Sequence, residues 1–488
     1  MRILINGATI VTMNSKEEII KNGVIITKDD KIEYIGSEFK GNKEDYDHVI
    51  DGENYIVIPG LVNAHNHSMS NMMKANFVNL PLEIWRQYVK GIWRVVQDEG
   101  LYLDVILGCI EMARNGITTS IDHFTNLFPK DYSGISQAYN AVVDSGIRSI
   151  LAPMVSDIRY DETIPLSQYI KSKEVSEVVN GITSAETAGN DIGYLREFLD
   201  EFKNKHSRFH CMLGPASPQR CSKRLLLDIK DLAGEYGIGV HLHVLESKTQ
   251  SEYTLKKFGK SAIAYMEEIG FLDKRISMAH VIWVDDNDIN IIAKTGTSVV
   301  HNPVSNIRLG DGIAPIIKMV RNGVNVAFGT DGPCSNDSQN LFETLKIGSL
   351  LHNPFEDNFE KWISPKEALK MATINAANAL NLGHLIGSLE KRKKADMVLL
   401  NRKSYPYIPN GDIYNQIVLC ETGKNIAKVI IDGKLVIEND KNKYIDEEMI
   451  YNKIEEFCSR NKDKFTKEIQ EVEILKPILK KMYYDVVK

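Results

Sequence analysis

The chain has 488 residues, a length that predicts either about three units of ~150 residues or one large barrel with an accessory domain. Its 43% hydrophobic and 25% charged residues are ordinary for a globular enzyme and exclude extended disorder. The 59 Lys and Arg residues nearly balance the 65 Asp and Glu residues, so no basic excess exists to neutralise nucleic-acid phosphates. We therefore expect no nucleic-acid partner.

The sequence also bears on the cellular compartment. No apolar run approaches the ~20 residues of a membrane helix, and residues 1–14 alternate like a strand where a signal peptide would need an apolar core. The cysteines are scattered without CxxC pairs, which predicts neither a disulfide framework nor a cysteine-based zinc site. They are Cys109, Cys211, Cys221, Cys334, Cys420 and Cys458. We expect a cytoplasmic protein without a membrane partner.

Both ends of the chain contain short strand-like segments. Residues 1–58 alternate between apolar and polar residues, with Gly, Asn and Asp at the turns. The strand signature returns at 395–401 and 428–437, and a charged helical stretch follows from about residue 445. The sequence thus predicts a small β-sandwich domain formed from both chain ends, 1–58 and 385–440, with a helical tail over 441–488.

Between these ends, residues 59–384 alternate between strands and helices. Amphipathic helical stretches such as 101–115, 225–237 and 314–323 separate most of the strands, and a helix is expected near 364–380. The eight predicted strands are 56–67, 116–124, 147–156, 208–217, 238–246, 276–283, 297–303 and 324–332. This pattern predicts an α/β fold with a (β/α)8 TIM-like barrel. An open doubly wound sheet is the alternative, but it would want a GxGxxG after a strand, which the sequence lacks.

An HxH pair closes the first predicted barrel strand. His65 and His67 lie two residues apart, so on a strand both imidazoles project to the same side and can hold one metal ion. A lone HxH is a weak signal. Its position directly after a strand and turn, at the mouth of the predicted barrel, favours the metal interpretation.

The fifth predicted strand carries His243 at its end and Glu246 three residues later. A carboxylate beside the attacking water is what a hydrolase needs to move a proton to the leaving group. A surface glutamate after a strand is the alternative. His241 shares the strand parity of His243 but lies one layer deeper, so we interpret it as a barrel-interior histidine, with direct metal ligation as the alternative.

Two further strands end in polar residues. His280 ends the sixth strand, and Asp331 ends the eighth before a Gly-Pro turn. Asp331 taken alone could instead cap the next helix. Three histidines, one aspartate and a water form a nitrogen and oxygen site suited to Zn²⁺, with Fe²⁺ as the alternative.

These residues resemble the amidohydrolase superfamily, and more narrowly its branch of methylthioadenosine/S-adenosylhomocysteine deaminases and triazine hydrolases. The closing segments ADMVLLN and DGKLV match as well, so the resemblance extends to about residue 440. The other matching stretches are PGLVNAHNH (59–67), LPLEIW (80–85), GPASPQRCS (214–222), HVLE (243–246), AH (279–280), HNPVSNIRLGDGIAP (301–315) and GTDGPCSNDSQNLFE (329–343).

The resemblance implies roles for individual residues and a homo-oligomeric state. One divalent metal would be bound by His65, His67, His243 and Asp331. Glu246, His280 and Asp331 would be catalytic, acting on the attacking water and the developing tetrahedral centre, and His301 would contact the substrate. Dinuclear relatives need a carboxylated lysine on the fourth strand, and 208–217 contains none, which favours a single metal.

Other residues are candidates for the substrate pocket because they lie near strand ends. For Trp85 and Trp93, an aromatic core anchor is the alternative. Val96 and Gln97 stand near the position where nucleoside deaminases have a ribose-binding glutamate, which leaves ribose recognition open. Ordinary turn roles are the alternative for the three loop residues. The remaining candidates are Asp122, His123 and Arg159, with Asn306, Ser335 and Asn336 in the loops.

The leading hypothesis is a metal-dependent hydrolytic deaminase of an amino-substituted N-heterocycle of the purine, adenosine-like, pterin or triazine type. A hydrolase that displaces chloride or alkylamine from a triazine-like ring is the alternative within the class, because the attack is shared and only the leaving group differs. A non-catalytic metal-binding barrel is the alternative from another class.

Overall fold

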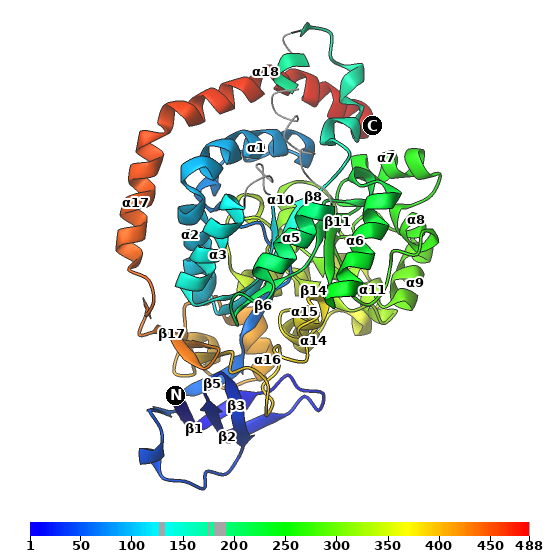
Figure 1. Ribbon diagram of the computed structural model, residues 1–488. Coiled ribbons are helices and arrows are strands. Elements are labelled where there is room, and N and C mark those ends of the chain that lie inside the picture. The colour runs from blue at the N-terminus through cyan, green and yellow to red at the C-terminus, as the bar shows by residue number, and fades with distance from the viewer. Residues whose placement is uncertain (126–131, 174–175, 180–191, 488) are drawn as a thin grey trace.

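The computed structural model describes residues 1–125, 132–173, 176–179 and 192–487. A sheet built from both ends of the chain lies at one end of the molecule, and a ring of parallel strands and surrounding helices forms its body (Figure 1). Within the described ranges, no helix is both long and apolar enough to cross a membrane.

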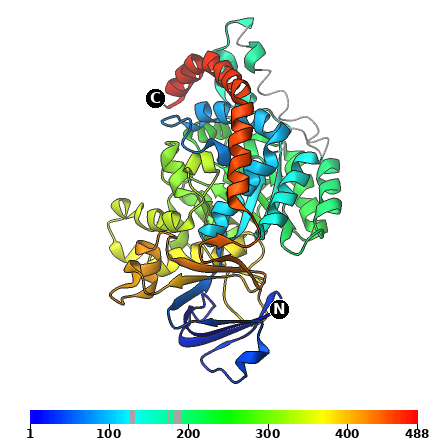
Figure 2. The ribbon, with the colours of Figure 1, turned by 90° about the vertical axis from the view of Figure 1, so that its left-hand side faces the viewer.

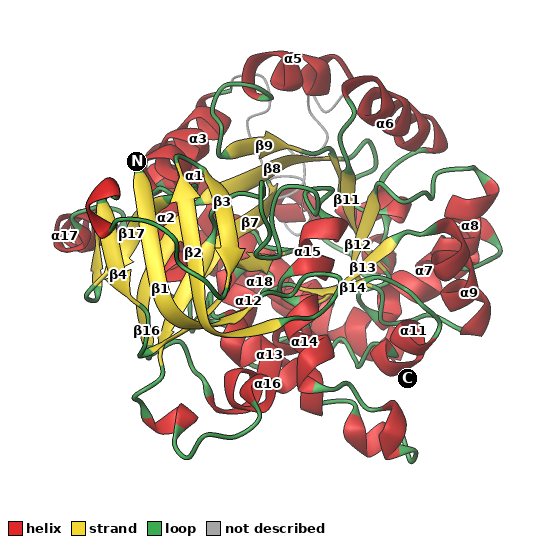
Figure 3. Cartoon of the chain, turned by 90° about the horizontal axis from the view of Figure 1, so that it is seen from below, coloured by secondary structure: helices red, strands yellow, loops and turns green. Residues whose placement is uncertain are grey.

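The terminal strands join in one nine-stranded sheet, seen in yellow at the left of Figure 3. The strand β1 divides its pairing: residues 3–6 pair with β4, and residues 9–10 pair with β5. The side chains of Ile3, Val57 and Leu399 meet in the buried core of this sheet. Its strands are β1 (Arg2–Val11), β2 (Ile19–Lys28), β3 (Lys31–Gly36), β4 (His48–Asp51), β5 (Tyr55–Pro59), β15 (Met397–Asn401), β16 (Ile426–Ile431), β17 (Lys434–Glu438) and β18 (Lys441–Asn442).

The strand signature over 428–437 covers two strands, because the structure folds this stretch into the hairpin β16–β17. Asp432 and Gly433 form the turn, with φ of 53° and 73°. A two-residue Asp-Gly loop adopts these positive φ angles readily and matches the twist of antiparallel strands.

The body of the molecule is a closed parallel barrel. Leu213 bridges to Val240, and the amide of Ala64 donates to the carbonyl oxygen of Phe328 over 3.0 Å, so the two arcs of strands meet on both sides. This arrangement confirms the predicted (β/α)8 fold. The barrel strands are β6 (Leu61–Asn63), β7 (Ile117–Phe124), β8 (Arg148–Val155), β9 (Phe209–Cys211) with β10 (Gly214–Pro215), β11 (Val240–Val244), β12 (Ile276–His280), β13 (Ser298–His301) and β14 (Val326–Phe328).

Two predicted elements are divided in the structure. The expected strand 56–67 splits at Gly60 into β5 of the terminal sheet and β6 of the barrel. A Cβ atom at Gly60 would lie 2.1 Å from Oγ1 of Thr118, so only glycine allows this crossing. The expected helix 364–380 becomes α14 and α15, because Thr373 has non-helical φ and ψ of −132° and −100°.

Helices surround the barrel on all the connections that the structure describes. They are α1 (Leu82–Glu99), α2 (Leu101–Arg114), α3 (Ser133–Ser145), α5 (Ile192–Phe202), α6 (Lys223–Tyr236), α7 (Lys248–Phe258), α8 (Ala262–Glu268), α9 (Asp286–Thr295), α10 (Pro303–Arg308), α11 (Ile316–Arg321), α12 (Pro333–Asn336), α13 (Leu341–Leu350), α14 (Pro365–Met371), α15 (Ile374–Ala379) and α16 (Ile413–Asn415).

The tail forms two helices, α17 (Glu447–Arg460) and α18 (Lys462–Val487). In Figures 1 and 2 they run up the side of the barrel and then across its top over α1. Tyr88 of α1 shares a buried cluster with Leu475 and Leu479 of α18, and its hydroxyl donates to Oε1 of Glu473 over 2.5 Å. The tail therefore holds α1 against the barrel mouth.

A buried ion network connects the barrel to the terminal sheet and yields a stability prediction. Nε of Arg148 lies 3.0 Å from Oδ2 of Asp396, and its Nη2 lies 3.0 Å from Oδ1 of Asp432. Because Arg148 is 1% exposed, Arg148→Met is expected to lower the free energy of unfolding by about 3–5 kcal/mol, since Asp396 loses its cation and Asp432 keeps only Lys394 at 3.0 Å. Denaturant titration measures the change.

The matched control for this experiment is Arg196→Met. Arg196 pairs with Glu235 on the surface, with both side chains more than two-fifths exposed, so its loss is expected to change the free energy of unfolding far less than Arg148→Met does. Equal losses for the two variants would contradict the role assigned to the buried network.

Candidate metal centre and active site

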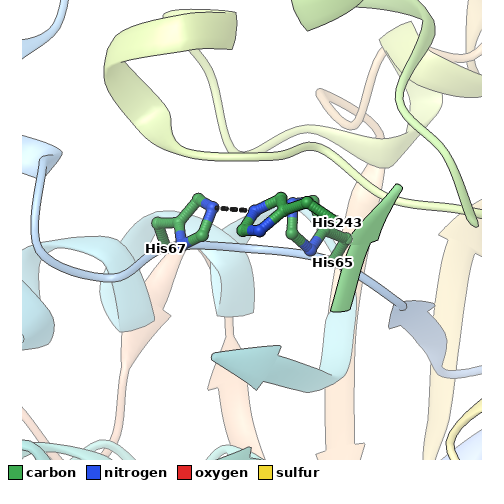
Figure 4. Close-up of side chains that lie close together, drawn as sticks. All are labelled: His65, His67 and His243. Carbon is green, nitrogen blue, oxygen red and sulfur yellow. Dashed lines mark hydrogen bonds between the residues drawn. The ribbon is translucent and has the colours of Figure 1, made fainter. Parts of the chain in front are cut away.

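Three histidines converge at the mouth of the barrel (Figure 4). His65 and His67 follow β6, which ends at Asn63, so they lie in the loop after the strand and not on the strand as predicted. Nε2 of His67 lies 3.1 Å from Nε2 of His243, which comes from β11. One ring nitrogen from each of the three lies within 4.8 Å of the others.

Hydrogen bonds fix the protons on two of these rings. Nδ1 of His67 lies 2.7 Å from the carbonyl oxygen of His123, and Nδ1 of His243 lies 2.9 Å from that of Ala216. A carbonyl oxygen only accepts, so each Nδ1 donates and each neutral ring presents a lone pair at Nε2. The two Nε2 atoms face each other at 3.1 Å, a separation that a shared proton or a shared metal ion stabilises.

A second chain of hydrogen bonds orients His65. Its Nδ1 lies 2.8 Å from Nε2 of His241, whose Nδ1 lies 2.8 Å from Oγ of Ser277. With both nitrogens bonded, His241 supports His65 from below, as the interior interpretation predicts. Nε2 of His65 is buried without a hydrogen bond, and burial lowers the pKa of His65 to about 4. This ring is therefore neutral at pH 7, as a metal ligand must be.

Asp331 completes the group from the end of β14. Its Oδ1 lies 3.3 Å from Nε2 of His65 and 3.5 Å from Nε2 of His67. The hydroxyl of Ser305 donates to its Oδ2 over 2.6 Å, which favours the ionised carboxylate. Its φ of 62° is unusual for a residue with a Cβ atom and marks a strained backbone at the strand end.

The donor set fits a divalent metal. Three imidazole nitrogens come together, and a carboxylate oxygen of Asp331 lies within 3.5 Å of two of them. The hydrogen bonds on the far nitrogens of His67, His243 and His65 hold the orientation of the three rings. Such a tetrahedral nitrogen and oxygen set suits zinc. A second group of His65, His123 and His241 also lies within 4.8 Å, but the nitrogens of His241 are already used in hydrogen bonds.

A carboxyl group and an imidazole lie beside this centre. Oε1 of Glu246 lies 3.5 Å from Nε2 of His280, and Oε2 accepts a hydrogen bond from Gln250 over 3.2 Å. Nδ1 of His280 lies 2.9 Å from Oδ1 of Asn306, which must accept and so leaves a lone pair at Nε2 of His280. Burial raises the pKa of Glu246 above its usual value, which suits a group that takes up and returns a proton.

A cavity opens above these residues. His67, His243, Glu246 and Asp331 line its reactive part. The rest of the lining includes the aromatic side chains of Trp85, Trp93 and Tyr160 and the basic side chains of Arg86, Lys90 and Arg220.

The predicted substrate contacts occupy different places. Trp85 lines the cavity and donates from Nε1 to the carbonyl oxygen of Cys334 over 3.3 Å. His123 is fully buried and stacks on His243, with ring centres 4.6 Å apart. Arg159 pairs with Asp161 over 2.7 Å, and Nε2 of His301 lies 3.1 Å from Nε2 of His352. The described lining includes neither Arg159 nor His301.

The remaining pocket candidates mostly support the loops. Asp122 accepts a hydrogen bond from the amide of Ser68 over 3.0 Å, and Asn336 donates to the carbonyl oxygen of Thr330 over 2.7 Å. Ser335 donates to the carbonyl oxygen of Gly332 over 2.9 Å. These bonds fit the turn roles, whereas Trp93 does line the cavity.

Sequence reasoning missed the basic part of the lining. Arg86 and Lys90 lie one turn apart on α1, a spacing that puts them on one face of a helix with Trp93. That spacing was available in the sequence, but basic residues on a helix usually face solvent. Arg220 stands in the GPASPQRCS stretch without any signal that separates a ligand contact from a loop residue.

Comparison with known proteins places the chain among relatives of matching length. A 5′-deoxyadenosine deaminase of Methanobrevibacter smithii is 33% identical over 456 residues, covering 92% of this chain and 96% of the relative. A 5-methylthioadenosine/S-adenosylhomocysteine deaminase of Thermoanaerobacter pseudethanolicus is 32% identical over 458 residues, covering 93% and 97%.

Solved structures share the fold. An adenosine deaminase from Xanthomonas campestris with bound zinc superimposes with a TM-score of 0.80 at 21% identity, covering 94% of this chain and 98% of the other. An atrazine chlorohydrolase from Arthrobacter aurescens complexed with zinc gives a TM-score of 0.80 at 24% identity, covering 93% and 99%. The model of the amidohydrolase family matches residues 56–436. The chain belongs to the amidohydrolase family.

Proposed function

We propose that the chain is a metal-dependent hydrolytic deaminase that replaces the amino group of an N-heterocycle with oxygen and releases ammonia. The observation that carries the proposal is the group of inward-facing ring nitrogens of His65, His67 and His243, with Glu246 and His280 beside it. Relatives of more than 30% identity are named deaminases of adenosine derivatives, which makes a purine the first ring to test.

His65, His67, His243 and Asp331 would hold one divalent metal, Zn²⁺ first and Fe²⁺ as the alternative. A cation of this kind lowers the pKa of bound water to about 7 and so supplies a nucleophile at neutral pH. The fourth barrel strand begins with β9, and residues 208–211 there include no lysine that could bind a second metal.

The other residues handle protons. Glu246 takes a proton from the attacking water and delivers it to a ring nitrogen of the substrate, for which its raised pKa is suited. His280 would accept a hydrogen bond at Nε2 from the attacking water and so orient it, 3.5 Å from Oε1 of Glu246. The new C–O bond replaces the C–N bond, and the amino group leaves as ammonia after it has accepted the second proton of the water through Asp331 or Glu246.

The proposal also covers a contact to the substrate ring and the state of the protein as a whole. Trp85 is suited to contact the heterocycle because it lines the cavity beside the reactive carboxylates. We propose a cytoplasmic homo-oligomer whose partner is a small heterocyclic substrate and which binds neither nucleic acid nor membranes.

Ammonia release tests the proposal. Metal-loaded protein is expected to release ammonia from at least one compound of a panel containing adenosine, 5′-deoxyadenosine, guanine, pterin and an aminotriazine, and to contain about one equivalent of metal per chain. Enzymatic ammonia assay and elemental analysis measure both quantities. Release of chloride or alkylamine from triazines without any ammonia would favour the displacing hydrolase, and metal far below one equivalent would favour the non-catalytic barrel.

A further inference from the structure

We infer that Gln250 is a positioning residue for the reaction, because it holds Glu246 by both its backbone and its side chain and leaves one carboxylate oxygen facing the reacting atoms. The inference deepens the proposed function and rests on it for the role of Glu246. It applies to deamination and to the displacement of another group alike, because both need a positioned carboxylate beside the attacking water.

The carboxamide of Gln250 contacts Glu246 twice. Its Oε1 accepts a hydrogen bond from the backbone amide of Glu246 over 3.1 Å, and its Nε2 donates to Oε2 of Glu246 over 3.2 Å. A backbone amide only donates, so the oxygen of the carboxamide must face it and the nitrogen must face the carboxylate. Both ends of one side chain are therefore used on a single residue.

The two carboxylate oxygens of Glu246 consequently have different surroundings. Oε2 bonds Gln250, whereas Oε1 lies 3.5 Å from Nε2 of His280. Glu246 is buried and lines the cavity. A glutamate side chain has three rotatable bonds, and an anchored Oε2 restricts them before any substrate binds. Oε1 is thereby held in the place where a proton is taken up and returned.

The backbone before Glu246 also depends on this contact. Leu245 has a φ of 50°, an unusual value for a residue with a Cβ atom. Its carbonyl oxygen accepts hydrogen bonds from the amides of Ile282 and Trp283 over 3.1 Å and 3.3 Å. The amide that follows, of Glu246, is held by Gln250. The strained turn at the end of β11 is thus fixed on both sides.

Gln250 is itself held by a contact between α7 and α1. Its backbone amide donates to Oγ of Ser247, the N-cap residue of α7, over 3.4 Å. The hydroxyl of Ser247 donates to Oε1 of Glu83 on α1 over 2.7 Å. Ser247 and Glu83 are both buried. A continuous chain of hydrogen bonds therefore joins α1 to the reactive carboxylate, and such support fixes a functional side chain in advance.

A role limited to capping α7 is the alternative. In a capping box, the third residue of the helix bonds the backbone amide of the N-cap residue, which here is Ser247. Gln250 is the third residue of α7, but it bonds the amide of Glu246. Capping also does not need the second bond, from Nε2 to the carboxylate. Both differences favour the positioning role.

Turnover of the metal-loaded full chain tests the inference, on the panel compound with the highest kcat/KM. Gln250→Met keeps the length of the side chain and removes both bonds. It is expected to lower kcat about 10–100-fold, with KM within about threefold of wild type and metal content near one equivalent per chain. Gln250 also lines the cavity, so a rise in KM with unchanged kcat would indicate a substrate contact and would overturn the inference.

Gln416→Met is the matched control. Gln416 also accepts from a backbone amide, that of Gly411 over 3.3 Å, and donates from Nε2 to the carbonyl oxygen of Pro409 over 2.8 Å. It is not among the described residues that line the cavity. This variant is expected to leave kcat and KM within about twofold of wild type.

A double-mutant cycle shows whether Gln250 acts through Glu246. When Glu246 is already glutamine, adding Gln250→Met is expected to change kcat less than about threefold, because the proton transfer that Gln250 supports is gone. A further loss as large as in the single Gln250→Met variant means that Gln250 acts independently of Glu246, and it overturns the inference.

Crystal structures of the metal-loaded wild type and Gln250→Met separate this inference from the proposed function. If no compound of the panel is turned over, the proposed function fails for these rings, but the position of Glu246 can still be measured. Its carboxylate is expected to move about 1 Å or more in the variant, and an unmoved carboxylate overturns the inference. If Gln250→Met does not fold, Gln250→Asn takes its place with the same expected results, because the shorter amide cannot make both bonds.

Discussion

Replacing Glu246 with glutamine is expected to leave the metal in place and to reduce kcat about a thousandfold. The amide keeps the size of the side chain and can still bond Gln250, which lies 3.2 Å from Oε2. It cannot take a proton at Oε1, the atom that faces His280 over 3.5 Å. Positioned proton transfer contributes about 10²–10⁴-fold to turnover, and that contribution is what the substitution removes.

The measurement combines turnover with elemental analysis. Steady-state ammonia release gives kcat on the best compound of the panel, and metal per chain is determined on the same preparation. Glu252→Gln is the control, because this residue is exposed on α7 only six positions further on. If the metal is lost together with activity in Glu246→Gln, then Glu246 is a ligand and the proton-transfer role is wrong.

The barrel could be predicted because its signal is repeated. Eight apolar strands separated by amphipathic helices specify parallel strands with covered faces, and each predicted range overlaps a barrel strand in the structure. The local errors have local causes. Gly60 divides an apolar run that belongs to two sheets, and the Asp432–Gly433 turn divides another. Both pairs of strands look continuous when hydrophobicity alone is considered.

The reactive residues could be predicted for a related reason. In a parallel barrel all strand ends meet at one mouth, so polar residues after strands are brought together whatever their separation in the chain. The structure places His65 and Asp331, which are 266 positions apart, with Nε2 and Oδ1 separated by 3.3 Å. The hydrogen bonds that orient these side chains, such as the bond between His65 and His241, depend on how deep each side chain lies in the barrel. The sequence predicted them only in part.

The basic part of the cavity lining could not be predicted because its burial is tertiary. Arg86 and Lys90 lie on a helix whose sequence allows them to face solvent. Packing of Tyr88 of α1 against Leu475 and Leu479 of the C-terminal helix fixes which side of α1 faces the barrel. That contact joins segments nearly four hundred residues apart, and no local pattern specifies it.

Loss of a metal ligand is expected to have the second large effect. His243→Asn removes the ring nitrogen that lies 3.1 Å from His67, and the shorter amide cannot reach the same point. Metal per chain is expected to fall at least tenfold, and turnover is expected to fall to background. The stabilisation by bound metal should disappear as well, which amounts to about 2.7 kcal/mol when free metal is 100 times its Kd. Elemental analysis and thermal unfolding with and without added zinc measure these changes.

The same experiment distinguishes the two histidine groups when it is paired with His123→Asn. His123 belongs to the deeper group with His65 and His241, and its ring stacks on His243 without a hydrogen bond to either nitrogen. If the group of His65, His67 and His243 holds the metal, the His123→Asn variant keeps about one equivalent of metal per chain, whereas the His243→Asn variant loses it. The reverse result would place the metal in the deeper group, away from Glu246. His384→Asn, at an exposed histidine, should change neither metal content nor turnover, because a ligand must belong to the converging set and not merely be a histidine.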